Sequence, residues 1–396
     1  MKIFYISKYA TPSKDGNSDR KYILSKYMNR HNNEVTLIYS RSNGKKYKSS
    51  LKLFQKEIFE GLECIRINGI TLKQMGVNFR RMFSWIQFEI NLFLFFIFLP
   101  KSKRPDVVIA SSFSLFTFYT VAILKKIYKF KMLVEVRDIC PQTEVEFGRI
   151  KESGIIYKIF KYIELFGYKH ADKIFSTIPK FDDYLKTQGF LDKDFLCIPQ
   201  GFDREYIPSL KTKGAPNENF TVMYAGTIGE VNLVEEICIA AEQLQNTNIR
   251  FIVYGDGPLK ENLRQKYSHL QNLDFKGIVS KREIAEILME ADLLVNMWAD
   301  KSVYQYGVSP NKWIDYMLAA VPVLVTYNGH QSIINEAGCG WFIKANDPKL
   351  MAEKILEISK MSPTELRQIG LNGRKYAIEN LDYEILANKL LNFIYE

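Results

Sequence analysis

Short apolar segments alternate with longer amphipathic ones along most of the chain. The longer segments, such as SDRKYILSKYMNRH (18–31) and KREIAEILMEA (281–291), repeat apolar residues at helical spacing. The short ones predict β-strands: KIFYIS, EVTLIYS, DVVIASS, KMLVEVRD, KIFSTI and FLCIPQ in the first half, and FTVMYAG, IRFIVYG, LDFKGI, DLLVNMW and PVLVTY in the second. Alternating strands and helices predict parallel sheets covered on both faces. Two such sets predict an α/β protein with two Rossmann-like domains.

The predicted boundary between the domains lies in PQGFDREYIPSLKTKGAPNENF (199–220), which is rich in Pro, Gly, Asn and Lys and has no periodicity. The 396 residues are enough for two domains of roughly 200 residues each. We therefore expect an N-terminal domain over 1–200 and a C-terminal domain over 201–396. The final amphipathic run, 382–396, is predicted to be a helix that can pack back on the first domain.

One segment, FSWIQFEINLFLFFIFLP (83–100), has three possible interpretations. Its uninterrupted apolar run, 92–99, is far shorter than the roughly 20 residues that a membrane span needs, and Pro100 ends it. A core helix of the first domain is the favoured interpretation. An interfacial helix that dips into a bilayer is the second, because Arg80, Arg81 and Lys101 flank the segment.

Charge is unevenly distributed along the chain. Residues 1–200 hold 34 Lys and Arg against 19 Asp and Glu, whereas residues 201–396 hold 20 against 25. A basic first half predicts an anionic membrane surface or a phosphorylated substrate as a partner. Nucleic acid is not predicted, because the sequence has no zinc-ligand cluster and no basic run interleaved with stacking aromatics.

The cysteines and the first residues both predict a cytoplasmic location. Five scattered cysteines, an odd number, argue against a disulfide framework and a zinc site and are typical of a reducing compartment. The opening residues, MKIFYISKYA, lack the long apolar core of a signal peptide.

Three predicted strands of the second half end in turns that contain glycine: MYAGTIG, IVYGDGP and FKGIVS. Open α/β sheets bind ligands beyond the carboxyl ends of their strands. Glycine lets a backbone approach a ligand closely, and helix N-termini bind anions. One such glycine is usually a turn residue, but the three turns together predict a nucleotide site. Its candidate residues are Gly226, Thr227, Gly229, Gly255, Asp256, Gly257 and Gly277.

The segment GVSPNKWID (307–315) predicts a helix start that completes this site. Ser309 suits an N-cap and Pro310 suits the first helical position. Lys312 in the first turn opposes the helix dipole, which disfavours a structural role and predicts a bound pyrophosphate. Asp315 follows on the same face and can accept two hydroxyl groups of a ribose. The alternative for Asp315 is an exposed acid that stabilises the helix start.

These motifs carry a resemblance to a known family. GVSPNKWIDYMLAAVPVLV followed by EAGCGWFI resembles the donor-site signature of retaining GT-B glycosyltransferases of family 4. More narrowly, it resembles the bacterial O-antigen and capsule branch that includes fucosamine transferases. VEVRDICPQTEVEFG, KHADKIFSTIPKFDDYLKTQGF and IPQGFD extend the resemblance through the first half of the chain. It implies two Rossmann-like domains that face each other across a cleft.

The resemblance also implies roles for particular residues. A nucleotide, most simply UDP, would lie between the Gly255 turn and Gly277, with its ribose at Asp315. The diphosphate would meet Lys312, the Gly226 turn and the segment that holds Gly307, Val308, Ser309 and Asn311. In the first half, Gly16 would approach donor phosphate or acceptor, Arg20 would contact the acceptor, and Asp138 would be a catalytic residue beside the acceptor or the transferred sugar. The alternative for Asp138 is a helix cap or turn residue.

Two departures from the family pattern stand out. The family often has a Glu eight positions before its second acid, where this chain has Gly307. Many members carry a basic pair after the first glycine turn, where this chain reads IGEVNLVEE. Lys312 is therefore left to balance the negative charge of the diphosphate. We expect it to act in catalysis by stabilising the leaving diphosphate. No Asp-x-Asp motif stands at a predicted strand end, so we expect no metal and no other cofactor.

The function expected from this resemblance is retaining transfer of a sugar from a UDP-sugar to an undecaprenyl-diphosphate-linked saccharide in O-antigen or capsule assembly. We expect the enzyme to be attached peripherally to the inner face of the cytoplasmic membrane. Two alternatives stay open: a non-catalytic GT-B partner subunit, and a UDP-sugar 2-epimerase of the same fold.

Overall fold

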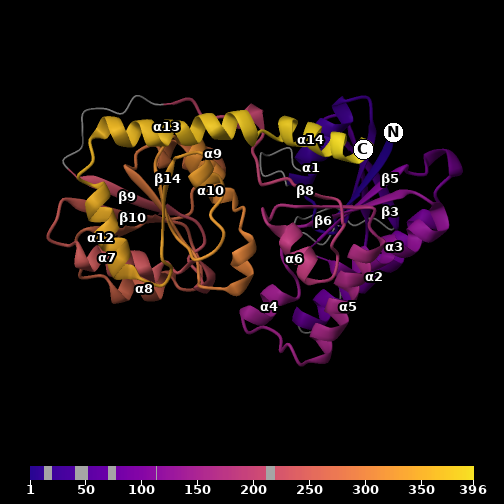
Figure 1. The fold of residues 1–396 in the computed structure, drawn as a ribbon, viewed down its shortest axis with the longest axis horizontal. Helices are drawn as coiled ribbons and strands as arrows, with labels where there is room; N and C mark the ends of the chain where they lie inside the picture. The colour runs from indigo at the N-terminus through magenta and orange to yellow at the C-terminus, as the bar shows by residue number, and fades with distance from the viewer. Residues whose placement is uncertain (13–19, 41–51, 70–76, 113, 211–218) are drawn as a thin grey trace. The chain divides into compact units, whose positions relative to one another are not determined.

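The computed structural model describes residues 1–12, 20–40, 52–69, 77–112, 114–210 and 219–396. The chain forms two compact units (Figure 1). Unit 1 comprises Met1–Pro199 together with Tyr383–Glu396, and unit 2 comprises Gln200–Asp382. Each unit is built around one largely parallel sheet with helices packed against it, which confirms the predicted α/β class.

The sheet of unit 1 has eight strands in the order β3-β4-β2-β1-β5-β6-β7-β8. Apart from the antiparallel pair β3–β4, its strands pair in parallel. The central strands are runs of Val, Ile and Phe buried on both faces, as a covered parallel sheet requires. The strands are β1 (Lys2–Ile6), β2 (Glu34–Ser40), β3 (Phe54–Phe59), β4 (Leu62–Ile67), β5 (Val107–Ser111), β6 (Lys131–Val136), β7 (Lys173–Ser176) and β8 (Phe195–Cys197).

Two groups of helices cover the opposite faces of this sheet. They are drawn from α1 (Arg20–Arg30), α2 (Val77–Ile97), α3 (Leu115–Tyr128), α4 (Gln142–Glu146), α5 (Ile155–His170), α6 (Phe181–Thr187) and α14 (Tyr383–Tyr395). Alternate residues of a strand point to opposite faces. Tyr5 belongs to the core cluster that α1 and α14 complete, whereas Phe4 contacts Phe95 and Phe96 of α2. Helices α2, α3 and α5 therefore lie on the face opposite α1 and α14, with α3 packed between the other two.

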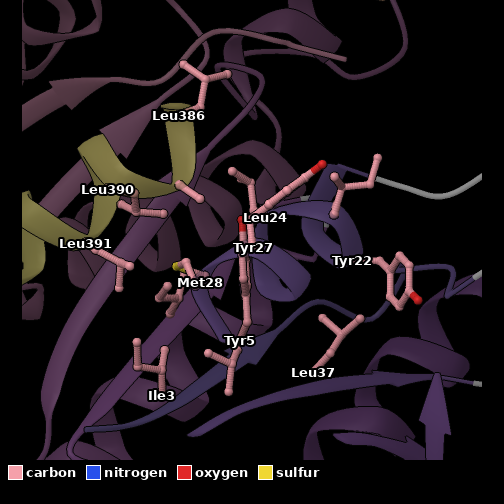
Figure 2. Packing of buried hydrophobic residues seen from close by; sticks show 14 of the residues in the cluster. Ile3, Tyr5, Tyr22, Leu24, Tyr27, Met28, Leu37, Leu386, Leu390 and Leu391 are labelled. Atoms are coloured by element: carbon pink, nitrogen blue, oxygen red, sulfur yellow. The ribbon is translucent and has the colours of Figure 1, made fainter. Parts of the chain in front are cut away.

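Helix α14 supplies one wall of the core of unit 1. Leu386, Leu390 and Leu391 of α14 belong to the same buried cluster as Leu24 and Met28 of α1 (Figure 2). All five of these residues are at most 3% exposed. The last helix of the chain is thus an integral part of the unit that holds the first strand.

Helix α2 confirms the core interpretation of its sequence along one face and leaves apolar side chains exposed on the other. Phe88, Leu92 and Phe96 are buried, so one face of the helix belongs to the core. Ile86 and Ile90, on the other face, are 45% and 56% exposed. Among the helices of the described residues, none has the length and the sustained apolar character that crossing a bilayer needs.

The sheet of unit 2 has six parallel strands in the order β11-β10-β9-β12-β13-β14. Numbered from its first strand, this order is 3-2-1-4-5-6, the Rossmann arrangement, whose switch point lies between β9 and β12. The strands are β9 (Phe220–Ala225), β10 (Ile249–Tyr254), β11 (Leu273–Phe275), β12 (Leu293–Met297), β13 (Val323–Thr326) and β14 (Gly340–Ile343). The helices are α7 (Glu235–Gln243), α8 (Lys260–Lys266), α9 (Lys281–Leu288), α10 (Asn311–Leu318), α11 (Ile333–Glu336), α12 (Pro348–Ile358) and α13 (Pro363–Asn380).

Three strands were not predicted from the sequence: β3, β4 and β14. The hairpin of β3 and β4 turns at Glu60 and Gly61, whose φ angles are 48° and 80°. Positive φ at both central residues is the geometry of a tight hairpin turn, so the Glu-Gly pair between two alternating segments was a usable signal.

Candidate functional site

The candidate site is centred on the switch point of the unit 2 sheet. The turn after β9 begins at Gly226, and the chain that leaves β12 leads to α10. Tyr316 of α10 joins the two strands, because its hydroxyl accepts a hydrogen bond from Ala225 N at 3.2 Å and lies 3.3 Å from Val295 O. The start of α10 is thereby fixed beside the Gly226 turn.

The predicted glycine turns do lie together. Gly226 N donates to Tyr254 O at 3.0 Å, and Gly255 N donates to Gly277 O at 3.2 Å. A Cβ atom on Gly255 would lie 1.9 Å from Gly226 O, and one on Gly257 would lie 2.2 Å from Ile228 O. These two positions therefore exclude any side chain, and the three turns form one continuous backbone surface.

Helix α10 begins one residue later than the sequence predicted. Pro310, not Ser309, is the N-cap, and no side chain caps the helix. The hydroxyl of Ser309 instead accepts a hydrogen bond from Gln200 N at 2.8 Å. The N-cap prediction for Ser309 and the first-position prediction for Pro310 are therefore wrong, because the hydroxyl binds a residue distant in sequence. The absence of a side-chain cap leaves the amide groups of this helix start available to a ligand.

Lys312 is held close to the Gly226 turn by neutral oxygen atoms. Its Nζ donates to Tyr224 Oη at 2.8 Å and to Asn232 Oδ1 at 2.9 Å, and it lies 4.6 Å from the centre of the Tyr224 ring. A Cβ atom on Gly226 would lie 2.4 Å from Lys312 Cε. Burial lowers the pKa of Lys312 to about 8. A cation desolvated in this way gains strongly from an anionic ligand.

Tyr224 and Asn232 hold the amino group of Lys312, and the sequence analysis predicted neither residue. Tyr224 lies in β9, 88 residues before Lys312, and its hydroxyl donates onward to Thr227 O at 2.8 Å. Asn232 lies in the run IGEVNLVEE, which lacks a basic residue. No local signal marked either residue, because their roles depend on the pairing of β9 with the distant α10.

The loop that leads to α10 is fixed by its backbone and by aromatic packing. Gly307 has φ 92°, a conformation that a residue with a side chain rarely adopts. Val308, which follows it, is 9% exposed. Tyr327 donates to Tyr304 O at 2.7 Å and thereby attaches the loop to the end of β13. Glycine at 307, where the resembling family often has Glu, thus has a conformational reason.

The remaining predicted residues of unit 2 lie around this centre. Asp315 is half-buried, one helical turn after Lys312. Asn311, the first residue of α10, is exposed, as is Thr227. Asp256 is exposed too, and its carboxylate accepts from Gly257 N at 2.8 Å. Gly229 is buried at the start of the short helix that carries Asn232.

The predicted residues of unit 1 have different surroundings. Arg20 is 4% exposed; its Nε donates to Glu135 Oε1 at 3.0 Å, and its remaining nitrogens donate to Ile198 O at 2.7 Å and to Pro199 O. The guanidinium thus holds the backbone at Ile198 and Pro199, where the first segment of unit 1 ends. Contact between Arg20 and an acceptor stays a prediction. Asp138 is exposed, two residues beyond β6, and Gly16 lies outside the described residues.

A pocket of about 580 Å³ also lies in unit 1, at the amino ends of β1 and β2. Phe4, Phe54 and Phe95 contribute to its lining, together with Lys2 and Lys103. Ligand sites of open α/β sheets form at the carboxyl ends of the strands, where the predicted acceptor residues lie. This pocket lies at the opposite edge of the sheet.

Comparison with known proteins gives a family match and a fold. Residues 219–361 match the family model "Glycosyl transferases group 1". A Pseudomonas aeruginosa protein named as a probable glycosyltransferase, WbjE, is 24% identical over 69% of this chain and 71% of its own length. A Salmonella typhimurium protein named as a colanic acid biosynthesis glycosyltransferase, WcaL, is 20% identical over 53% of each chain.

Solved structures resemble the whole chain. Sucrose-phosphate synthase from Thermosynechococcus elongatus superposes with a TM-score of 0.76 at 15% identity, covering 100% of this chain and 98% of its own. WaaG, a glycosyltransferase involved in lipopolysaccharide biosynthesis, gives a TM-score of 0.65 at 16% identity with 99% of both chains covered. HepE from Anabaena, solved with UDP, gives 0.66 at 11% identity with both chains fully covered.

The protein therefore has the GT-B fold, built from two Rossmann-like units. Residues 219–361 of its second unit match the glycosyl transferases group 1 model, and this stretch contains the Gly226 turn, Lys312 and Asp315. This match and the names of the relatives support a glycosyltransferase.

Proposed function

We propose that this protein is a retaining glycosyltransferase that moves a sugar from a UDP-sugar to a lipid-linked glycan. The observation that carries the proposal is Lys312, a half-buried cation held by neutral oxygens beside a glycine turn and a helix start without a side-chain cap. This arrangement suits a diphosphate, whose oxygens accept from an ammonium group and from backbone amides alike.

The proposed chemistry follows from these groups. As the glycosidic bond to the diphosphate breaks, negative charge grows on the leaving phosphate oxygen. Lys312 Nζ and the amides at the start of α10 stabilise that charge, so neither a metal nor another cofactor is required. Asp315 holds the ribose. The acceptor hydroxyl attacks on the face from which the diphosphate departs, and its proton passes to the departing phosphate oxygen. Asp138 acts beside the acceptor or the transferred sugar.

The pathway and the location belong to the same proposal. WcaL is named for colanic acid biosynthesis and WaaG for lipopolysaccharide biosynthesis, which supports a role in bacterial surface polysaccharide assembly. HepE was solved with UDP and with UDP-glucose, which supports a UDP-linked donor. An undecaprenyl-diphosphate-linked saccharide would be the acceptor, reached by an enzyme attached peripherally to the inner face of the cytoplasmic membrane.

The test is UDP binding followed by turnover. We expect UDP to bind the purified protein in calorimetry, and one of a panel of UDP-sugars to release UDP in the presence of an undecaprenyl-diphosphate-sugar mimic. Failure of UDP to bind at millimolar concentration would refute the proposed donor site.

One observation favours a second candidate, a non-catalytic GT-B partner subunit. Gly307 replaces a carboxylate that touches the transferred sugar in the resembling family, and its φ of 92° disfavours a Glu there. Such a subunit would bind UDP or glycan without releasing product. UDP binding without turnover of any donor, alone or with acceptor, would favour this candidate.

A further inference from the structure

Exposed apolar side chains are concentrated on one helical layer of unit 1. Of the eighteen large hydrophobic residues that are exposed in the described part of the chain, eleven lie on α2, α3 and α5 or directly after α2. Monomeric soluble proteins rarely gather so many on one surface without a function. Unit 2 contributes only Tyr206, Leu210 and Ile278 to the eighteen.

The exposed residues follow the helical repeat. On α2, Ile86, Ile90 and Ile97 are 45%, 56% and 54% exposed; on α5, Ile155, Ile159 and Tyr162 are 69%, 45% and 61% exposed. Their spacings of three, four and seven residues place each set in one stripe along its helix. We refer to these six residues, together with the exposed Tyr119 and Ile127 of α3, as the α2–α3–α5 face.

Aromatic side chains fill the grooves between the three helices. Trp85 of α2, Phe116 of α3 and Phe160 of α5 contact one another pairwise, with ring centres 5.8 to 6.4 Å apart. Tyr119 and Phe166 join α3 to α5 at 4.8 Å. The two stripes are therefore the edges of one surface rather than two separate patches.

The exposed charged side chains that the structure describes on these three helices are all basic. Glu89 and Glu164, the acids of the three helices, are buried, where Thr117 and Lys161 donate to their carboxylates. The exposed charged residues among the described side chains of these helices are Lys126, Lys158 and Lys169. Lys126 Nζ lies 5.7 Å from the centre of the Phe166 ring, at the border of the apolar surface.

We propose that the α2–α3–α5 face is the surface by which this protein docks on an anionic lipid bilayer. Apolar side chains that enter the acyl boundary while lysines meet anionic headgroups are the composition of an interfacial membrane surface. A second copy of the chain is a less suitable partner, because a symmetric contact between two such faces would bring their exposed lysines together and cause repulsion. The inference deepens the proposed peripheral attachment by naming its surface, and it adds α3 and α5 to the α2 segment.

Docking in this way would serve transfer to a lipid-linked acceptor. Helix α2 leads into β5 and α3 leads out of it, and α5 leads into β7, so the amino ends of all three lie at the carboxyl edge of the sheet. Asp138 follows β6 at that same edge. Docking through this face would thus place the carboxyl edge of the sheet, with Asp138, near the lipid headgroups. The diphosphate of the lipid-linked acceptor would lie at the same level.

The experiment is co-sedimentation of the full-length protein with vesicles of phosphatidylcholine, either alone or mixed 7:3 with phosphatidylglycerol, at low and high salt. We expect binding to the anionic vesicles at low salt. The double variant Ile155→Asp/Ile159→Asp should lower the partition coefficient at least tenfold, and Lys158→Ala should lower it about fivefold. Leu191→Asp is the matched control, because Leu191 is 72% exposed in unit 1 but lies outside the face.

Three outcomes would overturn the proposal. The first is wild-type protein that fails to bind the anionic vesicles, and the second is a double variant that binds them as well as wild type does. The third is a wild-type dimer in light scattering that the double variant converts to a monomer, since a second copy would then cover the face. UDP affinity and melting temperature, measured on the same variants, separate loss of docking from loss of the donor site or of folding.

Discussion

Replacing Lys312 by Met should weaken UDP binding and leave the fold as stable as before, or more so. The change keeps the length of the side chain and removes the charge that Tyr224 and Asn232 hold beside the Gly226 turn. A hydrogen bond to a charged group contributes about 1.5–3 kcal/mol, which corresponds to a loss of affinity of roughly ten- to a hundredfold.

Stability should respond in the opposite direction. Burial lowers the pKa of Lys312 to about 8, so the unfolded chain binds more protons than the folded one between pH 8 and the ordinary lysine range. Stability therefore rises with pH through that window, and below pH 8 the charged lysine opposes folding of the free protein. Removing the charge at pH 7 should not lower the melting temperature.

The same pKa predicts how UDP binding depends on pH. Because the diphosphate favours the charged lysine, affinity should fall by up to tenfold per pH unit above pH 8. Binding at pH 8 should take up about half a proton, since half of the lysines are then neutral. Titration calorimetry in two buffers with different ionisation enthalpies measures this uptake.

Lys349→Met provides the control, because the Lys349 side chain is 78% exposed on α12 of the same unit. It should change neither UDP affinity nor its pH dependence. The reasoning is refuted if Lys312→Met binds UDP as wild type does and melts at a lower temperature, which would make Lys312 a structural residue.

Three further predictions concern other parts of the two units. Gly226→Ala should weaken UDP binding about tenfold in calorimetry, because the new Cβ would lie 2.4 Å from Lys312 Cε and displace the ammonium group; unchanged affinity would mean that the lysine head tolerates movement. Asp138→Asn should abolish most sugar transfer while UDP affinity and melting temperature stay near wild type; an unfolded variant would identify a structural residue instead. Arg20→Met should lower the free energy of unfolding in urea by about 3–5 kcal/mol, because it leaves Glu135 buried without its partner. Burial alone would raise the pKa of Glu135, but the charges of Arg20, Lys21 and Arg137 and the hydrogen bond from Ser111 together outweigh burial and lower that pKa to about 2. Wild-type stability from the ionised Glu135 should therefore be present above pH 4.5 and lost as the pH falls toward 2. An Arg20→Met protein with the wild-type acid transition would contradict the contribution of Arg20.

The sequence analysis predicted the features that a local pattern controls, such as strands and glycine turns. It missed the side-chain contacts that depend on residues distant in the sequence. Strands such as β1, β6 and β9 were recognisable because a parallel sheet buried on both faces needs continuous apolar runs. The three glycine turns could be placed together because parallel strands end at one edge. The GT-B fold, confirmed by comparison with solved structures, followed from the resemblance of the motifs.

The details of the site could not be read from one segment. The hydroxyl of Ser309 had the right position for a helix cap, but Gln200, more than a hundred residues away, donates to it. Arg20 had the position of a ligand-binding residue, but its guanidinium donates to Glu135 and to the carbonyl oxygen of Ile198, which follows β8. In both cases a polar side chain satisfied its hydrogen bonds with the nearest partner in space, which sequence spacing does not report.

Helix α14 has a consequence for the order in which the protein can be made. The core of unit 1 lacks the wall formed by Leu386, Leu390 and Leu391 until the whole of Gln200–Asp382 has been synthesised. At about 5–20 residues per second, translation of that intervening segment takes roughly 10 to 40 s. During this interval Leu24 and Met28 lack the leucines that bury them in the finished protein, so unit 1 can complete its core only after the whole of unit 2 has been synthesised.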